Sequence, residues 1–580
     1  MQPKTSFFNK TVLKKDITRF APIWSIYTVF LLLMLFGMTG YVPAILAANV
    51  LEFPQAMVVI NALYAGVCAA FLFMDLFNGR LCNALHAFPL RRENWLTIHI
   101  LSGLLFSFVP NLLATGLASL LLQEYAYIAP IWLAISTLQH LFFFGSAVLC
   151  AICAGNLIGM TALYGIFHLI TLLIAGLAEL FYEPFLYGVK LNINTFTRFF
   201  PLEQMNAFQY AEFEVKHDAE IAYGVFHGLI GKQWLYVGLC AAAGVICLAL
   251  AWLVYRKRNL EAAGDLLSIK GLSPLFLLIC TVGAGSVLYL FSGAFGTESY
   301  VFMAVGTIVG YFAGSMLLSR TVKVFTKRSL LGFGIIVIAI TGTMLLTRLD
   351  PLGISRYVPA LEKIESAAVI GADKGYYYSP TDSILSYNGK INDSYYQITD
   401  QQELQSLQDF HKELIRIRPD TKNTPLCEVN ICYTLKNGRI INRYYKVEQN
   451  SKLGRRAGEY FNDMRYIFEI NDPSLLYKVF ESVVIEGYKD DNTVSVKLTD
   501  QEEIAGLLDA IKKDCEAGLM AQNWAYHGKY EENYYLDFSV DSKASETLGW
   551  NVSRKHLRVW TNSVNTTAYL QQMIAAHAEE

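Results

Sequence analysis

Nine runs of about twenty predominantly apolar residues fill most of the first 350 positions of this chain, and they limit how it can fold. A helix that rises 1.5 Å per residue needs about 20 apolar residues to cross a hydrocarbon layer of about 30 Å. Of the 580 residues, 54% are hydrophobic and only 17% are charged, which is typical of a membrane protein. The predicted spans are 21–41, 57–77, 96–122, 132–154, 160–180, 234–255, 274–294, 300–318 and 330–346.

These runs predict a polytopic α-helical membrane protein of about nine spans that ends in a soluble α+β domain. Before the first span, Phe8, Val12, Ile17 and Phe20 oppose a row of lysines, which predicts an amphipathic helix at the membrane surface. The predicted parts are this interfacial helix at 1–20, six spans within 21–265, three further spans within 266–348, and a C-terminal domain at 349–580.

The connectors between spans differ strongly in lysine and arginine content, which sets orientation. Sixteen of these residues lie within 4–19, 80–92, 256–270 and 320–328, which become inner segments if the N-terminus is cytoplasmic. The outer connectors hold four, Lys190, Arg198, Lys216 and Lys232, all in one long loop. We therefore expect a multi-pass protein of the cell membrane with a cytoplasmic N-terminus. With nine spans the C-terminal domain is extracellular, whereas eight or ten spans would reverse its side.

The C-terminal region has the sequence signals of a folded α+β domain. Asn437-Gly438, between two alternating apolar stretches, predicts a β-hairpin with a type I′ turn. Asp400 is the expected N-cap of an amphipathic helix, with Glu403 at the capping-box position. His411 on this helix is expected at the surface.

This helix pattern recurs further along the region. LTDQEEIAGLLDAIKKDC, from Leu498, repeats the helix signal, and KIESAAVIG, from Lys363, is echoed by FESVVIEG, from Phe480. Self-similarity of this kind is typical of a duplicated building block. Two related subdomains, at about 360–450 and 475–575, are therefore predicted.

The connector NALHAFPLRREN, Asn83 to Asn94, is more elaborate than a simple turn. Together with the preceding residues it places Leu81, Leu85 and Phe88 on one helical face, so it predicts a short helix lying on the membrane surface. Pro89 would end this helix, because the residue before a proline avoids helical geometry. Arg91 and Arg92 would then hold the next span at the headgroup level. An ordinary positively charged anchor explains the arginines but neither the apolar face nor the proline.

Three stretches resemble the permease subunits of type-2 ATP-binding-cassette transporters. NALHAFPLRREN resembles the family's proline-arginine connector, which touches the nucleotide-binding subunit. YRKRNLEAAG, with Arg258, Glu261 and Gly264, resembles the R-x-x-E-x-x-G end of its six-helix module. SFFNKTVLKKDITRFAP, from Ser6, resembles its interfacial helix. The three extra spans and the C-terminal domain are similar to the extended permeases of Gram-positive bacteria, which end in an extracellular domain.

The resemblance implies a non-catalytic transport subunit, most simply of an exporter, in the lipid bilayer. An ATP-binding-cassette nucleotide-binding subunit would dock on the connector, and two permeases would pair as a homodimer or heterodimer. No nucleic-acid partner is expected. The residues expected to couple to the ATPase are Arg80, Asn83, Leu85, Phe88, Pro89, Arg91 and Arg92.

The chain lacks a phosphate-binding G-x-x-x-x-G-K-[ST] loop, and GLIGKQ, from Gly228, has neither the spacing nor the hydroxyl. We therefore expect no cofactor on this chain, with ATP and Mg held by the partner subunit. The C-terminal region also lacks H-E-x-x-H and G-x-S-x-G motifs and paired metal-ligand spacing. Cys150 and Cys153 have C-x-x-C spacing but lie in an apolar run without a second pair of ligands nearby, so neither a catalytic nor a metal site is predicted.

Ionisable residues inside the spans are candidates for a polar route through the membrane. They are Asp75, His99, His140 and His168. Hydrogen bonding between helices explains them at least as well, and Asp75 could pair with Arg80. The stripe Gly306, Gly310 and Gly314 predicts close helix packing, within this chain or against another protomer.

Two other classes of function remain open. A membrane-anchored sensor or ligand-binding protein would use its helices only to display the C-terminal domain. A display anchor needs one or two spans, however, rather than nine with structured connectors. A polytopic membrane enzyme is the third possibility, and it lacks a recognisable catalytic cluster.

Overall fold

The structure, a computed structural model, describes residues 9–87, 91–182, 185–189, 200–218, 221–294, 300–371, 396–417, 426–448, 451–468, 470, 472–489, 492–520, 532–540, 554–560 and 563–577. The chain divides into two compact units. We call Met1–Leu177 with Phe196–Ala339 the first unit, and Ala178–Thr195 with Ile340–Glu580 the second unit.

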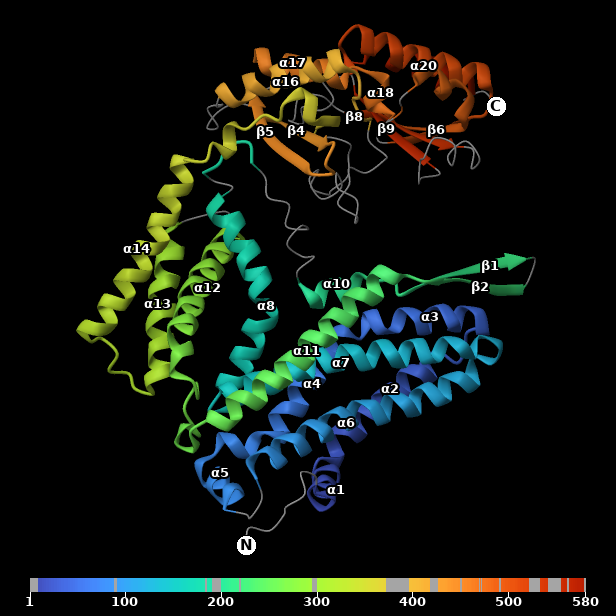
Figure 1. The fold of residues 1–580 in the computed structure, drawn as a ribbon. Coiled ribbons are helices and arrows are strands. Elements are labelled where there is room, and N and C mark those ends of the chain that lie inside the picture. The colour runs from blue at the N-terminus through green and yellow to red at the C-terminus, as the bar shows by residue number, and fades with distance from the viewer. Residues whose placement is uncertain are drawn as a thin grey trace. The chain divides into compact units, whose positions relative to one another are not determined.

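Helices build the first unit, and two of them, α8 and α14, continue into the second (Figure 1). Three short 3-10 helices matter below: η1 (Met74–Phe77), η2 (Gln123–Ile128) and η3 (Leu260–Ala262). The α-helices are α1 (Lys10–Arg19), α2 (Ala21–Gly37), α3 (Pro43–Ala56), α4 (Val58–Leu72), α5 (Gly79–His86), α6 (Arg92–Leu121), α7 (Ala129–Cys153), α8 (Leu157–Tyr182), α10 (Pro201–Ala207), α11 (Gly231–Lys257), α12 (Ser273–Ala294), α13 (Tyr300–Ser319) and α14 (Lys327–Leu349).

Among the residues that the structure describes, six helices are long and apolar enough to cross a membrane, namely α6, α7 together with η2, α11, α12, α13 and α14. Two broken pairs raise the number to eight if each pair is one span: α1 with α2, bent by 61°, and α3 with α4, bent by 51°. The chain is therefore a helical membrane protein in character, but the predicted nine spans are not confirmed. The run predicted as a span at 57–77 forms only the 15-residue helix α4, because η1 follows it.

Buried polar side chains join the helices of the first unit. The Tyr27 hydroxyl donates to Asn61 Oδ1 at 3.1 Å, and Asn61 Nδ2 donates to Gln139 Oε1 at 2.9 Å, which links α2, α4 and α7. Pro110 lies inside α6 and has no N–H, so the Phe106 carbonyl loses its helical donor. The Tyr64 hydroxyl from α4 replaces that donor at 2.8 Å. These bonds satisfy polar groups that would be costly to leave unpaired in an apolar interior.

Glycines set the closest helix contacts of the first unit. The stripe predicted on 306–314 lies on α13 and faces α12, where alanine side chains at Gly306 and Gly310 would overlap the carbonyl oxygens of Ala284 and Cys280. Gly314 has more room, since its nearest neighbour is Cys280 Cβ at 3.2 Å. The stripe therefore packs within this chain. Backbone approach this close lets dispersion contacts form along the full length of the two helices.

A β-hairpin lies along α3 in the first unit, formed by β1 (Ala211–Asp218) and β2 (Ile221–Leu229) (Figure 1). It falls in the long loop before α11, where no strand was predicted. Tyr125 from η2 fixes it by accepting a hydrogen bond from Gly224 N at 2.9 Å and by packing edge-on against Phe213.

Two antiparallel sheets with separate hydrophobic cores form the body of the second unit. The first sheet has the order β3-β4-β5 and packs with α16 and α17, and the second has the order β7-β6-β8-β9 and packs with α20 and α22. Their bounds are β3 (Ile364–Gly371), α16 (Gln401–Arg416), β4 (Leu426–Leu435), β5 (Ile440–Glu448), α17 (Lys452–Phe461), α18 (Met464–Ile467), α19 (Leu476–Val479), β6 (Phe480–Lys489), β7 (Asn492–Leu498), α20 (Gln501–Glu516), β8 (Glu532–Val540), β9 (Arg554–Trp560) and α22 (Val564–His577).

The repeated sequence patterns fall on equivalent elements of the two sheets. KIESAAVIG coincides with β3 and FESVVIEG with β6, and in both sheets the next helix is followed by a two-stranded antiparallel pair. Asp400 and Asp500 cap the two equivalent helices, α16 and α20, by accepting from backbone N–H groups of their first turns. The predicted N-cap at Asp400 is confirmed.

The predicted type I′ turn at Asn437-Gly438 is wrong. A type I′ turn needs positive φ at both central residues. Gly438 has a φ of 76°, but Asn437 is not among the described residues with positive φ. Gly438 N donates to the Leu435 carbonyl at 2.7 Å, and Leu435 N donates to the Arg439 carbonyl at 2.9 Å. The loop is therefore a turn closed by a glycine bulge. Gly438 is its single left-handed residue, and it follows the two central residues of the turn instead of being one of them.

Replacing Gly310 with alanine should push α13 away from α12, because the added Cβ meets the Cys280 carbonyl. We expect the free energy of unfolding to fall by about 1–3 kcal/mol, as overpacking typically costs. Gly314→Ala is the matched control and should cost less, since its neighbour is a side chain at 3.2 Å. Thermal unfolding of the purified proteins measures both. Equal losses would contradict the packing described.

Candidate functional site

One side of the connector helix α5 packs against the rest of the first unit, and its other side is exposed. The Asn78 side chain caps it by accepting from the N–H of Arg80 at 3.0 Å. Cys82 is buried, whereas Arg80, Leu81 and Asn83 are exposed. Of the other predicted docking residues, Phe88 and Pro89 lie outside the described residues, as does the side chain of Leu85. The described part of α5 thus offers an exposed face that carries a cation, an amide and a leucine.

Arg258 lies at the centre of what we call the α5 junction, which comprises η1, α5 and the adjoining ends of α1, α6, α7 and α11. Its guanidinium is buried and donates to the carbonyls of Ile152 at 3.0 Å, Ala151 at 3.3 Å and Leu76 at 3.0 Å. The first two carbonyls belong to the last turn of α7, where helical carbonyls lack intrahelical donors. A cation there also offsets the negative end of the helix dipole. One side chain therefore joins α11, α7 and the start of the connector.

Arg92 meets Arg258 at this junction. Its Nη1 donates to the Arg258 carbonyl at 3.4 Å, so residues 166 positions apart, from the two motifs singled out in the sequence, come together. The neighbouring Arg256 faces outward, pairs with Glu93 at 3.5 Å and lies over the Trp252 ring. Arg91 is exposed at the N-cap of α6.

The segment after α11 interlocks with the turn between α7 and α8. Gly264 adopts a φ of 95°, and its N–H donates to the Gly155 carbonyl at 2.6 Å. Gly155 and Gly159 have no space for a side chain, because carbonyls of residues 262–266 occupy that space. Glu261 is exposed. Within the predicted motif, Arg258 and Gly264 hold the fold, and Glu261 is left at the surface.

Two residues of α1 complete the junction, and sequence reasoning missed both. Arg19 Nη1 lies 3.3 Å from Asp75 Oδ2 in η1, so Asp75 pairs with Arg19 rather than with Arg80. Asp16 is buried, with its Oδ2 at 2.7 Å from His99 Nδ1 and 3.1 Å from Ser102 Oγ on α6. A signal for Asp16 existed, since it is the only acid of a basic helix and shares the apolar side with Val12 and Phe20.

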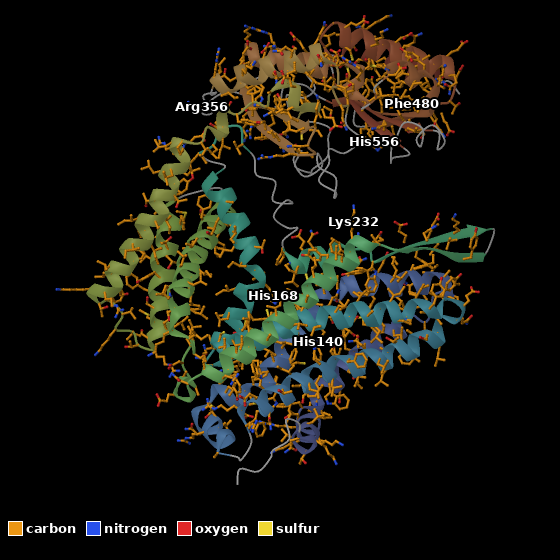
Figure 2. All side chains as sticks on the ribbon, viewed as in Figure 1. His140, His168, Lys232, Arg356, Phe480 and His556 are labelled. Atoms are coloured by element: carbon orange, nitrogen blue, oxygen red, sulfur yellow. The ribbon has the colours of Figure 1, made fainter. Side chains whose placement is uncertain are left out.

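The two remaining candidates, His140 and His168, are labelled in Figure 2, and each has a local partner. On α7, His140 Nε2 lies 3.1 Å from the Gly103 carbonyl, and its ring stacks on Phe144. On α8, His168 Nε2 lies 3.0 Å from Ser146 Oγ. No hydrogen bond between described residues joins His99, His140 or His168 to one another. Asp75, paired with Arg19, has no hydrogen bond to these histidines within the described part of the chain either, so the four polar residues predicted as a route occupy four separate hydrogen-bonded sites.

In the second unit, one strand holds both segments through which the chain enters it. Arg443 on β5 donates from Nη2 to the Ile354 carbonyl at 2.9 Å, which fixes the segment after α14. The next residue, Tyr444, donates its N–H to the Gly188 carbonyl at 3.2 Å, which fixes the segment after α8. Gly188 has a φ of 77°, and any side chain there would overlap the Tyr445 ring.

His411 is fully buried behind this strand, so its predicted surface position is wrong. It shares the inner side of α16 with Leu407, Phe410 and Leu414. Its Nδ1 lies 3.1 Å from the Tyr433 hydroxyl, and its Nε2 lies 2.8 Å from the Tyr445 hydroxyl. Burial, with the nearby Arg443 cation, lowers the pKa of His411 to about 3. The neutral imidazole has one N–H donor and one acceptor, which suits two hydroxyl partners.

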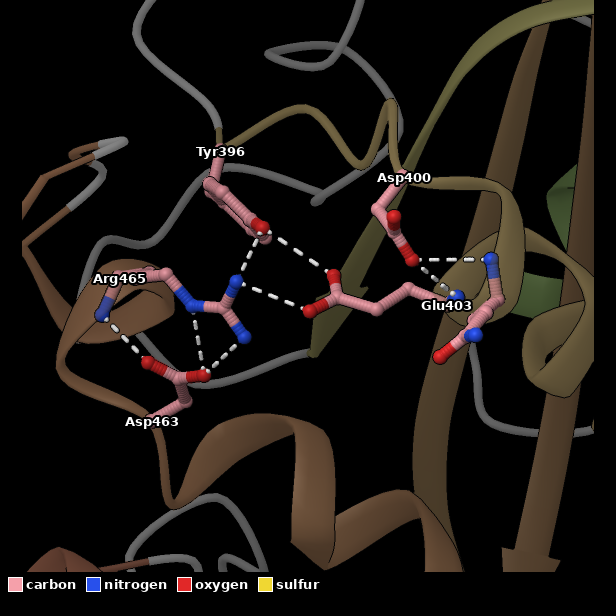
Figure 3. A network of polar contacts seen from close by, with 6 residues as sticks. Tyr396, Asp400, Glu403, Asp463 and Arg465 are labelled. Atoms are coloured by element: carbon pink, nitrogen blue, oxygen red, sulfur yellow. Dashed lines mark hydrogen bonds and ion pairs between the residues drawn. The ribbon is translucent and has the colours of Figure 1, made fainter.

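Arg465 ties α16 to the segment that leads into the second sheet (Figure 3). Its Nη1 donates to Glu403 Oε1 at 3.0 Å and to the Tyr396 hydroxyl at 2.6 Å, and its Nε donates to Asp463 Oδ2 at 2.8 Å. The hydrogen bonds to Asp463 and Glu403 raise the pKa of Arg465, whereas burial raises the pKa of Tyr396 to about 12. The Glu403 carboxylate thus bonds to Arg465 and Tyr396 rather than forming the predicted capping box.

Comparison of the chain with known protein families, with curated proteins and with solved structures finds no match. Among the described residues, no three His, Cys, Asp or Glu side chains are grouped as metal ligands would be. The geometry of the α5 junction is therefore the basis on which a function can be proposed.

Acidification should destabilise the second unit through His411. Its pKa is about 3 when folded and close to the ordinary value of 6.5 when unfolded. Between these two values the unfolded chain binds a proton that the folded chain does not. The free energy of unfolding should therefore fall by about 1.4 kcal/mol per pH unit as the pH drops below about 6.5.

Hydrogen exchange of the α16, β4 and β5 amides at several pH values measures this dependence. His411→Gln keeps a donor and an acceptor, and it should flatten the pH dependence. His556→Gln is the control. The His556 side chain lies on β9 and is partly exposed, so its replacement should leave the pH dependence in place. An unchanged slope in His411→Gln would contradict the assignment.

Proposed function

We propose that this chain is the permease subunit of a type-2 ATP-binding-cassette transporter, most simply an exporter, driven by a separate nucleotide-binding subunit. The observation that carries the proposal is the attachment of the connector. Leu76, in the 3-10 helix η1 that directly precedes α5, is bound to Arg258, which also binds the end of α7. A loop that only reversed the chain would need no such bond, whereas a docking element that transmits force does.

The contacts supply a path for force from α5 into the helices. A push on the exposed face of α5 acts on η1, which Arg258 holds to α7 and α11. The Arg19–Asp75 pair passes the same displacement to α1. The hydrogen bonds of Arg258 are buried and charge-assisted, which makes them stiff and costly to break. In the second pair Asp75 is buried and Arg19 is partly exposed, and together the two contacts would make these elements move as one.

Energy for transport would come from the partner subunit. The sequence has no phosphate-binding loop, so ATP and Mg would be held by the nucleotide-binding subunit and not by this chain. The exposed Arg80 and Asn83, with Arg91, offer polar groups for its docking. The chain would have no catalytic role, and two permeases, identical or different, would line the pathway.

The charge distribution supports a cytoplasmic α5 junction and an extracellular second unit. Lysine and arginine are concentrated in the segments that hold α1, α5 and the end of α11, as expected for cytoplasmic connectors. In this arrangement β5 would hold the extracellular ends of α8 and α14. The second unit would then be able to sense or assist substrate at the outer side.

Co-expression with candidate nucleotide-binding subunits tests the proposal. A stable complex should co-purify, and Arg80→Glu should weaken it by about tenfold or more, because it reverses a charge on the docking face. Lys232→Glu makes the same charge change on the exposed first turn of α11, labelled in Figure 2, and should leave binding unchanged. If no ATPase binds and the protein instead retains a ligand on the second unit, the chain is a membrane-anchored sensor.

Arg258→Met should disrupt the coupling of the partner's ATPase activity to the permease while leaving docking of the partner intact. It removes the guanidinium donors to three carbonyls at the junction, of which the Ile152 carbonyl keeps the Ser268 hydroxyl as a donor, so we expect a stability loss of about 2–3 kcal/mol. We also expect the partner to bind without its ATPase activity responding to the permease. Arg256→Met removes an exposed ion pair two residues away and should have little effect. Equal ATPase stimulation in both variants would contradict the proposed path.

A further inference from the structure

A groove with apolar walls runs between α2 and α4. Its volume is about 800 Å³, which lies in the range of ligand sites. Its walls are made by side chains along both helices, among them Ile23, Ile26, Phe30, Leu63, Val67 and Phe71. Ile26 and Leu63 are 70% and 64% exposed, so the groove opens on the surface of the first unit. From Phe20 to Phe30 it follows about 15 Å of helix.

The floor of the groove presents aromatic rings and no free hydroxyl. Tyr27 and Tyr64 line it with stacked rings whose centroids are 3.9 Å apart. Their hydroxyls point into the unit, where Tyr27 donates to Asn61 and Tyr64 donates to the Phe106 carbonyl. A molecule in the groove would therefore contact carbon along its whole length. Its body must be apolar and need no hydrogen bonds.

One end of the groove is positively charged. Arg19 lines it there, beside Met74, and the Arg19 side chain is 42% exposed. Its Nη1 faces Asp75 at 3.3 Å, while the Met74 sulfur, at 3.8 Å, is the only hydrogen-bond partner of its Nη2 among the described residues. A guanidinium has five N–H donors, so the Nη2 side can bind an anion while Asp75 keeps the other side in place.

The helix that carries Arg19 extends this positive charge. Lys10, Lys14 and Lys15 of α1 are exposed, and the only acid of the helix, Asp16, is buried against His99. An amphipathic helix with this basic face lies on a membrane surface and attracts anionic headgroups. The groove therefore runs from a headgroup-level cation into the apolar layer.

From this arrangement we propose that the groove binds an anionic phospholipid of the leaflet on which α1 lies, with the phosphate at Arg19 and one acyl chain between α2 and α4. A second copy of the chain fits less well, because it would have to bury Arg19 without a counter-charge beyond Asp75. The inference goes beyond the proposed transport function, and it does not depend on an ATPase partner.

Photolabelling of the full-length protein in vesicles tests the proposal. The probes are phosphatidylglycerol and phosphatidylcholine that carry the same diazirine in one acyl chain, and labelled peptides are identified by mass spectrometry. We expect peptides of α2 and α4 to take up phosphatidylglycerol about fivefold more than phosphatidylcholine. Arg19→Gln should remove this preference. Arg328→Gln, an exposed cation at the start of α14, should keep it.

A second pair of variants tests the groove itself. Val67→Trp fills the groove and should reduce labelling of both helices by either lipid, whereas Leu120→Trp, at a 77% exposed position of α6, should not. Equal labelling by the two lipids in the unaltered protein, or a preference that survives Arg19→Gln, would overturn the proposal. Disulfide-linked dimers of Ile26→Cys, with no lipid label at the groove, would assign it to a second copy instead.

Discussion

The buried guanidinium of Arg258 is the interaction on which the arrangement of the first unit most depends. The last carbonyls of α7 need donors, and Arg258 supplies them to Ala151 and Ile152 while its charge opposes the helix dipole. Because the same side chain also binds Leu76, the start of the connector is fixed to two long helices. The connector is thereby part of the helix assembly rather than a loop attached to it.

A buried arginine also fixes a chain segment in the second unit. Arg443 is as buried as Arg258, and it too holds main-chain carbonyls of a segment that leaves a long helix. Near Arg443, the Tyr445 ring packs against Gly188, where a side chain would overlap it. The Tyr445 hydroxyl lies within hydrogen-bond distance of the neutral His411 imidazole. Both units therefore fix the ends of apolar helices by burying an arginine against backbone oxygen, which is stable only while every partner stays in place.

Patterns within a few neighbouring residues predicted much of this structure. Contacts between residues far apart in the sequence could not be predicted. Asp400 was predictable as a cap, because its partners lie two and three residues away. The pairing of Asp16 with His99 joins residues 83 positions apart, and no local pattern specifies it. His411 was misplaced because one polar residue on an apolar helical face looks exposed until its two tyrosine partners are known. Arg258 was singled out by its motif, but its partners could not be predicted. They are main-chain carbonyls of residues far away in the sequence, and a main-chain carbonyl leaves no residue-specific signal.

Under the proposed function, α5 and α1 would move as one body when a nucleotide-binding subunit acts on the connector. Spin labels at Leu81→Cys on α5, Lys14→Cys on α1 and Leu120→Cys near the far end of α6, all exposed positions, report their separations by pulsed electron paramagnetic resonance. Between the ATP-bound and nucleotide-free complex, we expect a constant distance from residue 81 to residue 14 and a changed distance from residue 81 to residue 120. A shift between residues 81 and 14, with the other distance unchanged, would contradict it.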